Sequence, residues 1–119
     1  MSLEISNSEL AKYQDDSDVL KATFEQIQKD LGQYGLEAPI DIEGDTPFLK
    51  IFNNLRPVVE YLIEKDTPKL AQVIYRMDLN ESKVAEALDN QSKENPVDAL
   101  TLLIVEREMM KVVLRRKYS

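Results

Sequence analysis

Histidine, cysteine and tryptophan are absent from this sequence. Without histidine and cysteine, the chain cannot form a Ser-His-Asp triad, a cysteine nucleophile, a histidine-ligated haem site or a zinc site built from these ligands. Serine, threonine, lysine, tyrosine and carboxylates remain as nucleophiles, but none of them has a visible activating partner in the sequence. We therefore expect no catalytic residues, no metal ligands, no cofactor and no enzymatic activity.

Long apolar runs and an excess of positive charge are also lacking. The longest uninterrupted apolar run, residues 102–105, is far shorter than the ~20 residues that a membrane-spanning helix needs. The 15 Lys and Arg against 22 Asp and Glu give a formal charge of -7, which disfavours attraction to nucleic-acid phosphates and anionic lipid. The start of the chain lacks the basic flank and apolar core of a signal peptide. We expect a cytoplasmic protein with no membrane partner, and the charge disfavours a nucleic-acid partner.

The first pattern that is present is an apolar stripe, which recurs at spacings of three and four as on one face of an α-helix. The stripe consists of Leu10, Tyr13, Leu20, Phe24, Ile27 and Leu31. Gly32 and Gly35 offer a stop for this helix, whereas Ser17 interrupts the stripe beside three aspartates. We expect one helix over about residues 8–31 or two pieces broken near Ser17. The seven-residue period also makes the stripe a candidate surface for self-association.

Three capping residues followed by proline predict three further helix starts: Thr46-Pro47, Thr67-Pro68 and Asn95-Pro96. Asn80 predicts another helix over residues 81–89. Pro57 interrupts the apolar pattern after Pro47 and predicts a kink or a division at Arg56.

No stretch shows the two-residue alternation of a strand, and 119 residues suit one domain. We expect an all-α fold, a single-domain helical bundle of about five helices. Residues 1–8 are predicted to form a flexible N-terminus and residues 9–119 the all-α domain. The polar connection at residues 33–46 contains Asp41, Glu43 and Asp45, but a calcium loop would need Gly and Glu where Thr46 and Phe52 stand. An acidic loop is therefore the better interpretation.

The last helix, from Pro96 to about Lys117, carries apolar residues around most of its circumference. Such a helix is either central in the fold or shared with another chain. Met109 and Val113 therefore join the stripe residues as interface candidates. Arg107 lies within this apolar stretch, and we expect it to pair with a carboxylate of another helix: Glu60, Glu64 or Asp78.

Residues 74–88 look like a helix-turn-helix, with apolar residues at the expected positions and Asn80 as the cap of the second helix. Asp78, however, stands where a turn glycine is usual. The second helix would bring Glu81 and Glu86 to DNA against Lys83 alone, and this net negative charge would cost affinity. A plain helical hairpin is favoured, and an acidic helix-turn-helix-like transcriptional regulator is the alternative interpretation.

The stretch at residues 70–78, followed by residues 104–108 and Lys111, resembles a pattern in small helical proteins of Bacteroidetes bacteria that have no assigned activity. This resemblance implies a bacterial cytosolic helical protein. From the residues themselves, our leading hypothesis is a noncatalytic helical protein-protein interaction domain. Its expected partner is itself, as a homo-oligomer, or another protein.

Overall fold

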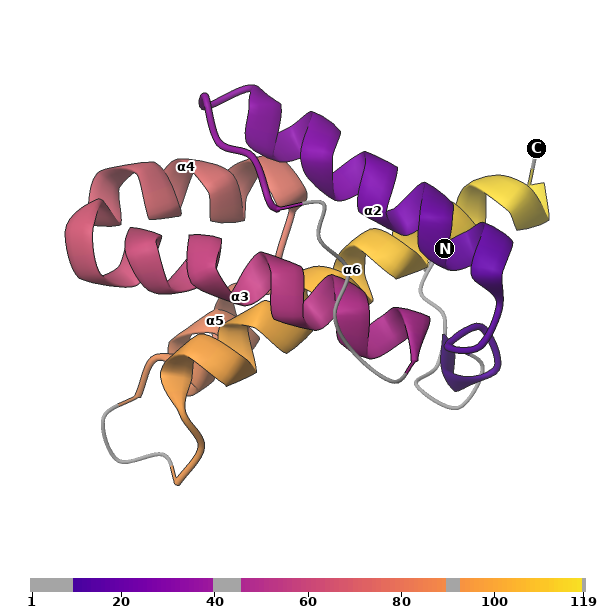
Figure 1. Ribbon diagram of the computed structural model, residues 1–119. Helices are drawn as coiled ribbons and strands as arrows, with labels where there is room; N and C mark the ends of the chain where they lie inside the picture. Colours follow the sequence, from indigo (N-terminus) through magenta and orange to yellow (C-terminus); the bar gives the residue numbers. More distant parts are fainter. Residues whose placement is uncertain (1–9, 40–45, 90–92, 119) are drawn as a thin grey trace.

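Five α-helices follow one another in the computed structural model, which describes residues 10–39, 46–89 and 93–118 (Figure 1). They are α2 (Ser17–Gly32), α3 (Pro47–Lys65), α4 (Thr67–Met77), α5 (Glu81–Ala87) and α6 (Pro96–Tyr118). No strand occurs in these three ranges. The expected all-α helical bundle of about five helices is confirmed. The predicted flexible N-terminus and the acidic loop with Asp41, Glu43 and Asp45 lie outside the described residues.

Most of the helix starts that the sequence predicts have side-chain caps. Thr46 accepts a hydrogen bond from the Leu49 amide at 3.2 Å, and Asn80 accepts one from the Lys83 amide at 3.1 Å. Asn95 likewise caps α6 through the Val97 amide at 2.8 Å. These bonds satisfy amides that have no partner within the helix.

The start of α4 differs from the prediction, because Asp66 and not Thr67 is the cap. The Asp66 carboxylate accepts from the Lys69 amide at 3.1 Å, while its own amide donates to the Leu62 carbonyl at 3.1 Å. Asp66 therefore ends α3 and begins α4, and it is the single residue between the two helices.

The N-terminal stripe does not form one continuous helix. The chain turns between Leu10 and Asp16, with amide bonds from Tyr13 to Leu10 and from Asp16 to Tyr13. Asp16 then caps α2 by accepting from the amides of residues 18 and 19. Of the two expected arrangements, the one broken near Ser17 is confirmed.

The C-terminal end of α2 is followed by a turn at Gly35. This residue has a φ of 72°, a left-handed conformation that favours glycine, and the Leu36 amide donates a hydrogen bond back to the Leu31 carbonyl.

Pro57 does not divide its helix, because α3 continues from Pro47 to Lys65. Proline removes the hydrogen bond to the carbonyl of residue 53. Both Pro57 and Asn53 are exposed, so this carbonyl faces the side of the helix that water reaches. The opposite side carries Leu55, Val59 and Leu62, which are nearly fully buried. Packing of that side preserves the helix through the proline.

Helix α6 is the centre of the fold. It contacts α2, α3, α4 and α5, and Figure 1 shows it passing behind α2 and α3. Leu100, Ile104, Val105 and Met109 on this helix are each at most 1% exposed. The chain's own helices thus cover most of the apolar residues of α6, although Leu102 is 40% exposed. The last helix is central in the fold, as one of the two interpretations of the sequence expected.

Candidate functional site

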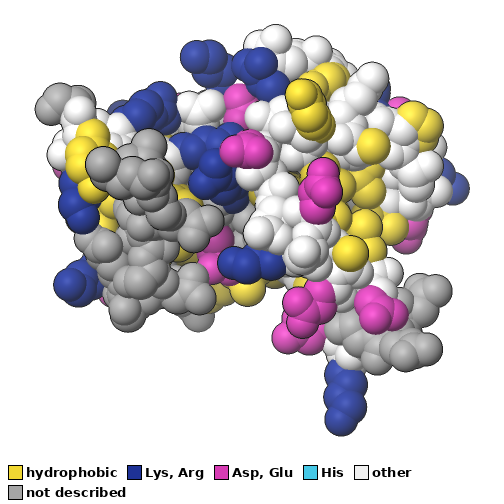
Figure 2. All heavy atoms as spheres, turned by 180° about the vertical axis from the view of Figure 1, so that it is seen from behind, with side chains coloured by type: hydrophobic (Ala, Val, Ile, Leu, Met, Phe, Trp, Pro, Cys, Tyr) yellow, Lys and Arg dark blue, Asp and Glu magenta, His cyan; other side chains and the backbone are white. Residues whose placement is uncertain are grey.

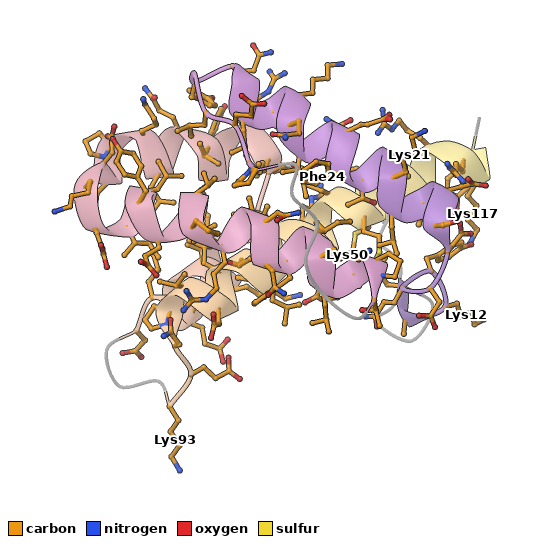
Figure 3. All side chains as sticks on the ribbon, in the orientation of Figure 1. Lys12, Lys21, Phe24, Lys50, Lys93 and Lys117 are labelled. Carbon is orange, nitrogen blue, oxygen red and sulfur yellow. The ribbon has the colours of Figure 1, made fainter. Side chains whose placement is uncertain are left out.

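A groove of about 370 Å³ lies between α2 and the first half of α3. Leu20 and Ile51 form its buried floor, and Phe24, which is partly exposed, lies over them. Lys21 and Glu25 from α2 and Lys50 from α3 line its rim. We call this feature the α2/α3 groove. Figure 3 shows Phe24 and Lys50 on the two facing helices, with Lys21 nearer the N-terminal end of α2.

The α2/α3 groove has this composition because α2 turns its apolar stripe inward and its polar residues outward. Ser17, Lys21 and Phe24 are spaced by four and three residues, so they share the edge of the helix next to α3. Within the described part of the chain, neither Lys21 nor Lys50 has an ion-pair partner. The groove thus combines a buried apolar floor with two lysines that have no ion-pair partner among the described residues.

Six of the eight interface candidates from the sequence are side chains of the monomer's own core: Leu10, Leu20, Ile27, Leu31, Met109 and Val113, each at most 2% exposed. Tyr13 and Phe24 are partly buried and pack at the edge of that core. Phe24 is the member of the set that lines the α2/α3 groove with part of its ring accessible. Of the eight, Phe24 therefore offers a contact surface in this groove.

A second feature, buried between α2 and α6, is a pair of carboxyl groups. Glu108 is 0% exposed, and the Asp30 side chain is 5% exposed. Lys111 places its Nζ atom 3.5 Å from Oε2 of Glu108 and 3.7 Å from Oδ2 of Asp30. Arg76 on α4 places Nε 3.7 Å from Oδ1 of Asp30, and Gln26 donates a hydrogen bond to the same oxygen at 3.1 Å.

Burial dominates the electrostatics of Glu108. Loss of water raises the pKa of Glu108 to about 8, and the neighbouring Asp30 carboxyl acts in the same direction, although Lys111 acts in the opposite direction. A perturbed carboxyl can indicate an active site when it lies in a cleft. Glu108 has no exposed surface, so a substrate cannot reach it in this conformation. The pair can hold helices together or bind a proton, but it cannot touch a substrate.

The sequence analysis singled out neither Glu108 nor Asp30. The sequence does contain a signal for both acids, namely their spacing from the apolar residues of their own helices. Glu108 lies four residues after Ile104 and four before Val112, which are both buried. Asp30 likewise lies three residues after Ile27, on the buried side of α2. An acid in phase with a buried stripe is a candidate buried acid.

Arg107 pairs with Asp78, one of the three expected acids, through a 2.9 Å bond from Nη2 to Oδ2. The Asp78 side chain is 81% exposed, so it is a surface partner. Asp78 itself adopts a left-handed conformation with φ of 58° and ends α4. Glu60 instead pairs with Arg56 at 3.1 Å, and Arg56 also hydrogen-bonds Asp98 of α6.

The opposite face of the molecule has a different character. Figure 2 shows Lys and Arg side chains gathered mainly on the side where α6 ends. There Lys29, Arg115 and Arg116 line a shallow groove between α2 and α6, together with Glu25. Arg115 donates to Gln26 at 2.8 Å, and Arg116 donates to the Asp18 carbonyl at 3.2 Å. These cations tie the end of α6 to α2, and cations are favoured at a helix C-terminus.

Neither a metal cluster nor a membrane-spanning helix appears in the described ranges. No three acidic side chains there come together as metal ligands. None of the helices in residues 10–39, 46–89 and 93–118 has the length and apolar composition to cross a membrane.

Comparison with known proteins gave no match: no family model, no curated protein and no solved structure is similar to this chain. The resemblance to Bacteroidetes proteins stays a prediction. Functional proposals for this chain rest on its own geometry.

Proposed function

We propose that this protein is a noncatalytic helical interaction domain that self-associates through the α2/α3 groove. The observation that carries the proposal is the groove itself, with its buried apolar floor, the partly exposed ring of Phe24, and the unpaired Lys21 and Lys50. Apolar centres with charged rims are typical of protein contact surfaces. The proposal includes a cytoplasmic location, which cell fractionation tests.

The proposal that the protein is noncatalytic is supported by the position of Glu108, the carboxyl group whose pKa is raised most. Glu108 and its neighbour Asp30 are enclosed by α2, α4 and α6, so neither is placed to act on a substrate. No histidine or cysteine is present to supply a nucleophile or base elsewhere.

The occupant that fits the α2/α3 groove is a second copy of this chain, because two charges of the rim, Lys21 and Glu25, complement each other across a two-fold axis. Lys21 and Glu25 lie one helical turn apart and both line the groove. In a two-fold dimer, each surface contacts the same surface of its partner. Two antiparallel copies of α2 that cross near residue 23 would bring Lys21 of each copy opposite Glu25 of the other. Phe24 would then lie beside the symmetry axis, over the apolar floor.

The experiment is a charge exchange at Lys21 and Glu25. Analytical ultracentrifugation from micromolar to millimolar concentration is expected to show a species of twice 13.7 kDa for the natural sequence. Lys21→Glu and Glu25→Lys should each weaken the dimer at least tenfold, because each places like charges across the axis. The double variant restores both opposite-charge pairs and should recover the dimer.

Lys65→Glu is the matched control, because Lys65 is an exposed lysine on α3 that lies outside the groove. It should leave the dissociation constant unchanged. A monomer at every concentration of the natural sequence would overturn self-association. A dimer that is insensitive to both single exchanges would overturn the assignment of the groove.

The alternative, an acidic helix-turn-helix-like regulator, would use the α4–α5 hairpin. Helix α5 has seven residues, and its exposed positions include Glu81 and Glu86 against Lys83. This composition repels phosphate. Filter binding to mixed-sequence duplex DNA at low salt tests the alternative, and salt-dependent retention would support it over the interaction domain.

A further inference from the structure

Three buried oxygens of the Asp30–Glu108 pair have no hydrogen-bond partner: Oδ2 of Asp30 and both carboxyl oxygens of Glu108. Unpartnered buried polar atoms are rare in folded proteins, because each one costs the free energy of its lost hydration. The contacts of Lys111 at 3.5 and 3.7 Å are ion pairs that lie beyond good hydrogen-bond length. The pair therefore lacks a donor.

If both carboxyls are ionised, Glu108 faces the negative charge of Asp30 and a single cation, Lys111. Helix α2 contributes Asp30, α6 contributes Glu108 and Lys111, and α4 contributes Arg76, which faces the outer oxygen of Asp30. Among the described residues, α3 and α5 bring no further charged group to Glu108. Two neighbouring carboxylates beside one partly exposed ammonium repel each other, and one of them holds a proton more tightly as a result.

We propose that Asp30 and Glu108 share one proton, which Glu108 carries and donates to Oδ2 of Asp30, and that this proton clamps α2 to α6. The proton supplies the missing donor and gives Oδ2 of Asp30 a partner. Glu108 is the carrier because it is fully buried, whereas the Asp30 carboxylate is supported by Gln26, Arg76 and Lys111. Loss of the proton leaves a second negative charge in the core and loosens the contact between the two helices.

The direction of the pH effect follows from the raised pKa of Glu108. An unfolded chain releases this proton near pH 4.5, whereas the folded chain holds it up to about pH 8. The stabilisation by the proton is therefore complete below pH 4.5 and is lost as the pH rises through about 8. Over this interval, the folding equilibrium constant falls by up to about tenfold per pH unit.

The first test follows the carboxyl carbon of Glu108 by NMR during a pH titration of the natural sequence. We expect its inflection near pH 8. Asp30→Asn removes the neighbouring negative charge, so the inflection should move to lower pH. An inflection near 4.5 in the natural sequence would overturn the proposal, and this measurement needs no variant to fold.

The second test compares urea unfolding between pH 5 and 9 for the natural sequence, Glu108→Gln and Glu106→Gln. Glutamine keeps the size of Glu108 and a donor for Asp30 but does not titrate, so this variant should lose most of the pH dependence. Glu106 is the matched control, because it lies on the same helix and burial also raises its pKa, but it faces Lys83 instead of the pair. Glu106→Gln should retain most of the slope, and equal slopes in Glu108→Gln and the natural sequence would contradict a shared proton.

Amide hydrogen exchange measures whether the contact between α2 and α6 loosens when the proton is lost. At pH 9, amides in the second half of α2, around Ile27 and Leu31, should exchange at least tenfold faster in the natural sequence than in Glu108→Gln. Comparison at one pH removes the intrinsic effect of base on exchange. Equal rates in the two proteins would show that the proton does not hold α2 on α6.

Discussion

Two cations on α6, Arg107 and Lys111, show how the exposure of the partner acid determines how much an ion pair contributes to stability. Arg107 bonds to Asp78, whose side chain is 81% exposed, so water screens the attraction. Lys111, four residues later, faces Asp30 and Glu108, which are 5% and 0% exposed. Removing Lys111 leaves a buried charge with less compensation, and removing Arg107 leaves an acid that water solvates.

We expect Arg107→Ala to lower the free energy of unfolding by less than about 1 kcal/mol, the usual limit for an exposed pair. Lys111→Met keeps the aliphatic stem but removes the charge, and it should cost roughly 1 to 3 kcal/mol, as for a stranded buried group. Urea unfolding at pH 6 measures both values. A larger loss for Arg107→Ala than for Lys111→Met would show that the Asp78 pair is better shielded than its exposure indicates.

At the scale of the helices, the junction between α3 and α4 depends on one side chain. Asp66 accepts from the Lys69 amide at 3.1 Å and also lies 3.8 Å from the Lys69 ammonium. The first bond caps α4, and the second is a partly exposed ion pair of small value.

Asp66→Ala should therefore destabilise the protein by about 1 kcal/mol, the usual cost of a lost N-cap. Asp66→Asn retains an oxygen that accepts from the Lys69 amide and loses only the charge, so it should cost a few tenths of that amount. Thermal unfolding followed by circular dichroism distinguishes the two variants. Equal losses would assign the stabilisation to the charge and not to the cap.

The two glycines at the end of α2 form a matched pair, because a Cβ added at either position meets no atom within 4 Å. Gly32 is the last helical residue, whereas Gly35 has a φ of 72°. Gly32→Ala should stabilise the protein by roughly 0.4 to 1 kcal/mol, because it reduces the freedom of the unfolded chain. Gly35→Ala should destabilise it by about 1 kcal/mol, because a side chain resists the left-handed conformation. Opposite shifts in melting temperature are the expected result.

The helices were largely predictable from the sequence because their signals are local. Thr46, Asn80 and Asn95 cap helices within three residues of themselves, and their type is sufficient to indicate it. The prediction that Pro57 kinks or divides its helix was wrong as regards the division, because burial of the opposite side of α3 outweighs the hydrogen bond that proline removes. The Asp30–Glu108 pair joins residues of two helices far apart in sequence, and neither acid differs locally from a surface acid. The α2/α3 groove likewise depends on how α2 and α3 pack together.

The core of the whole molecule is assembled on α6, since the other four described helices contact it. A chain that ends at residue 95 would leave the apolar sides of α2 and α3 without their main partner. We expect this truncated chain to lack the dispersed amide NMR spectrum of a folded protein. A chain that ends at residue 114 removes only exposed side chains among the described residues, and it should remain folded. A folded product from the shorter chain would show that α2 to α5 form a stable unit of their own.

The position of α6 along the chain also has a consequence for biosynthesis. Ribosomes add about 5 to 20 residues per second, so the 23 residues of α6 take on the order of seconds to emerge after α5. During that time Leu55, Val59 and Leu62 of α3 have no α6 to cover them. Folding of the other helices around α6 is therefore completed only after α6 has been synthesised.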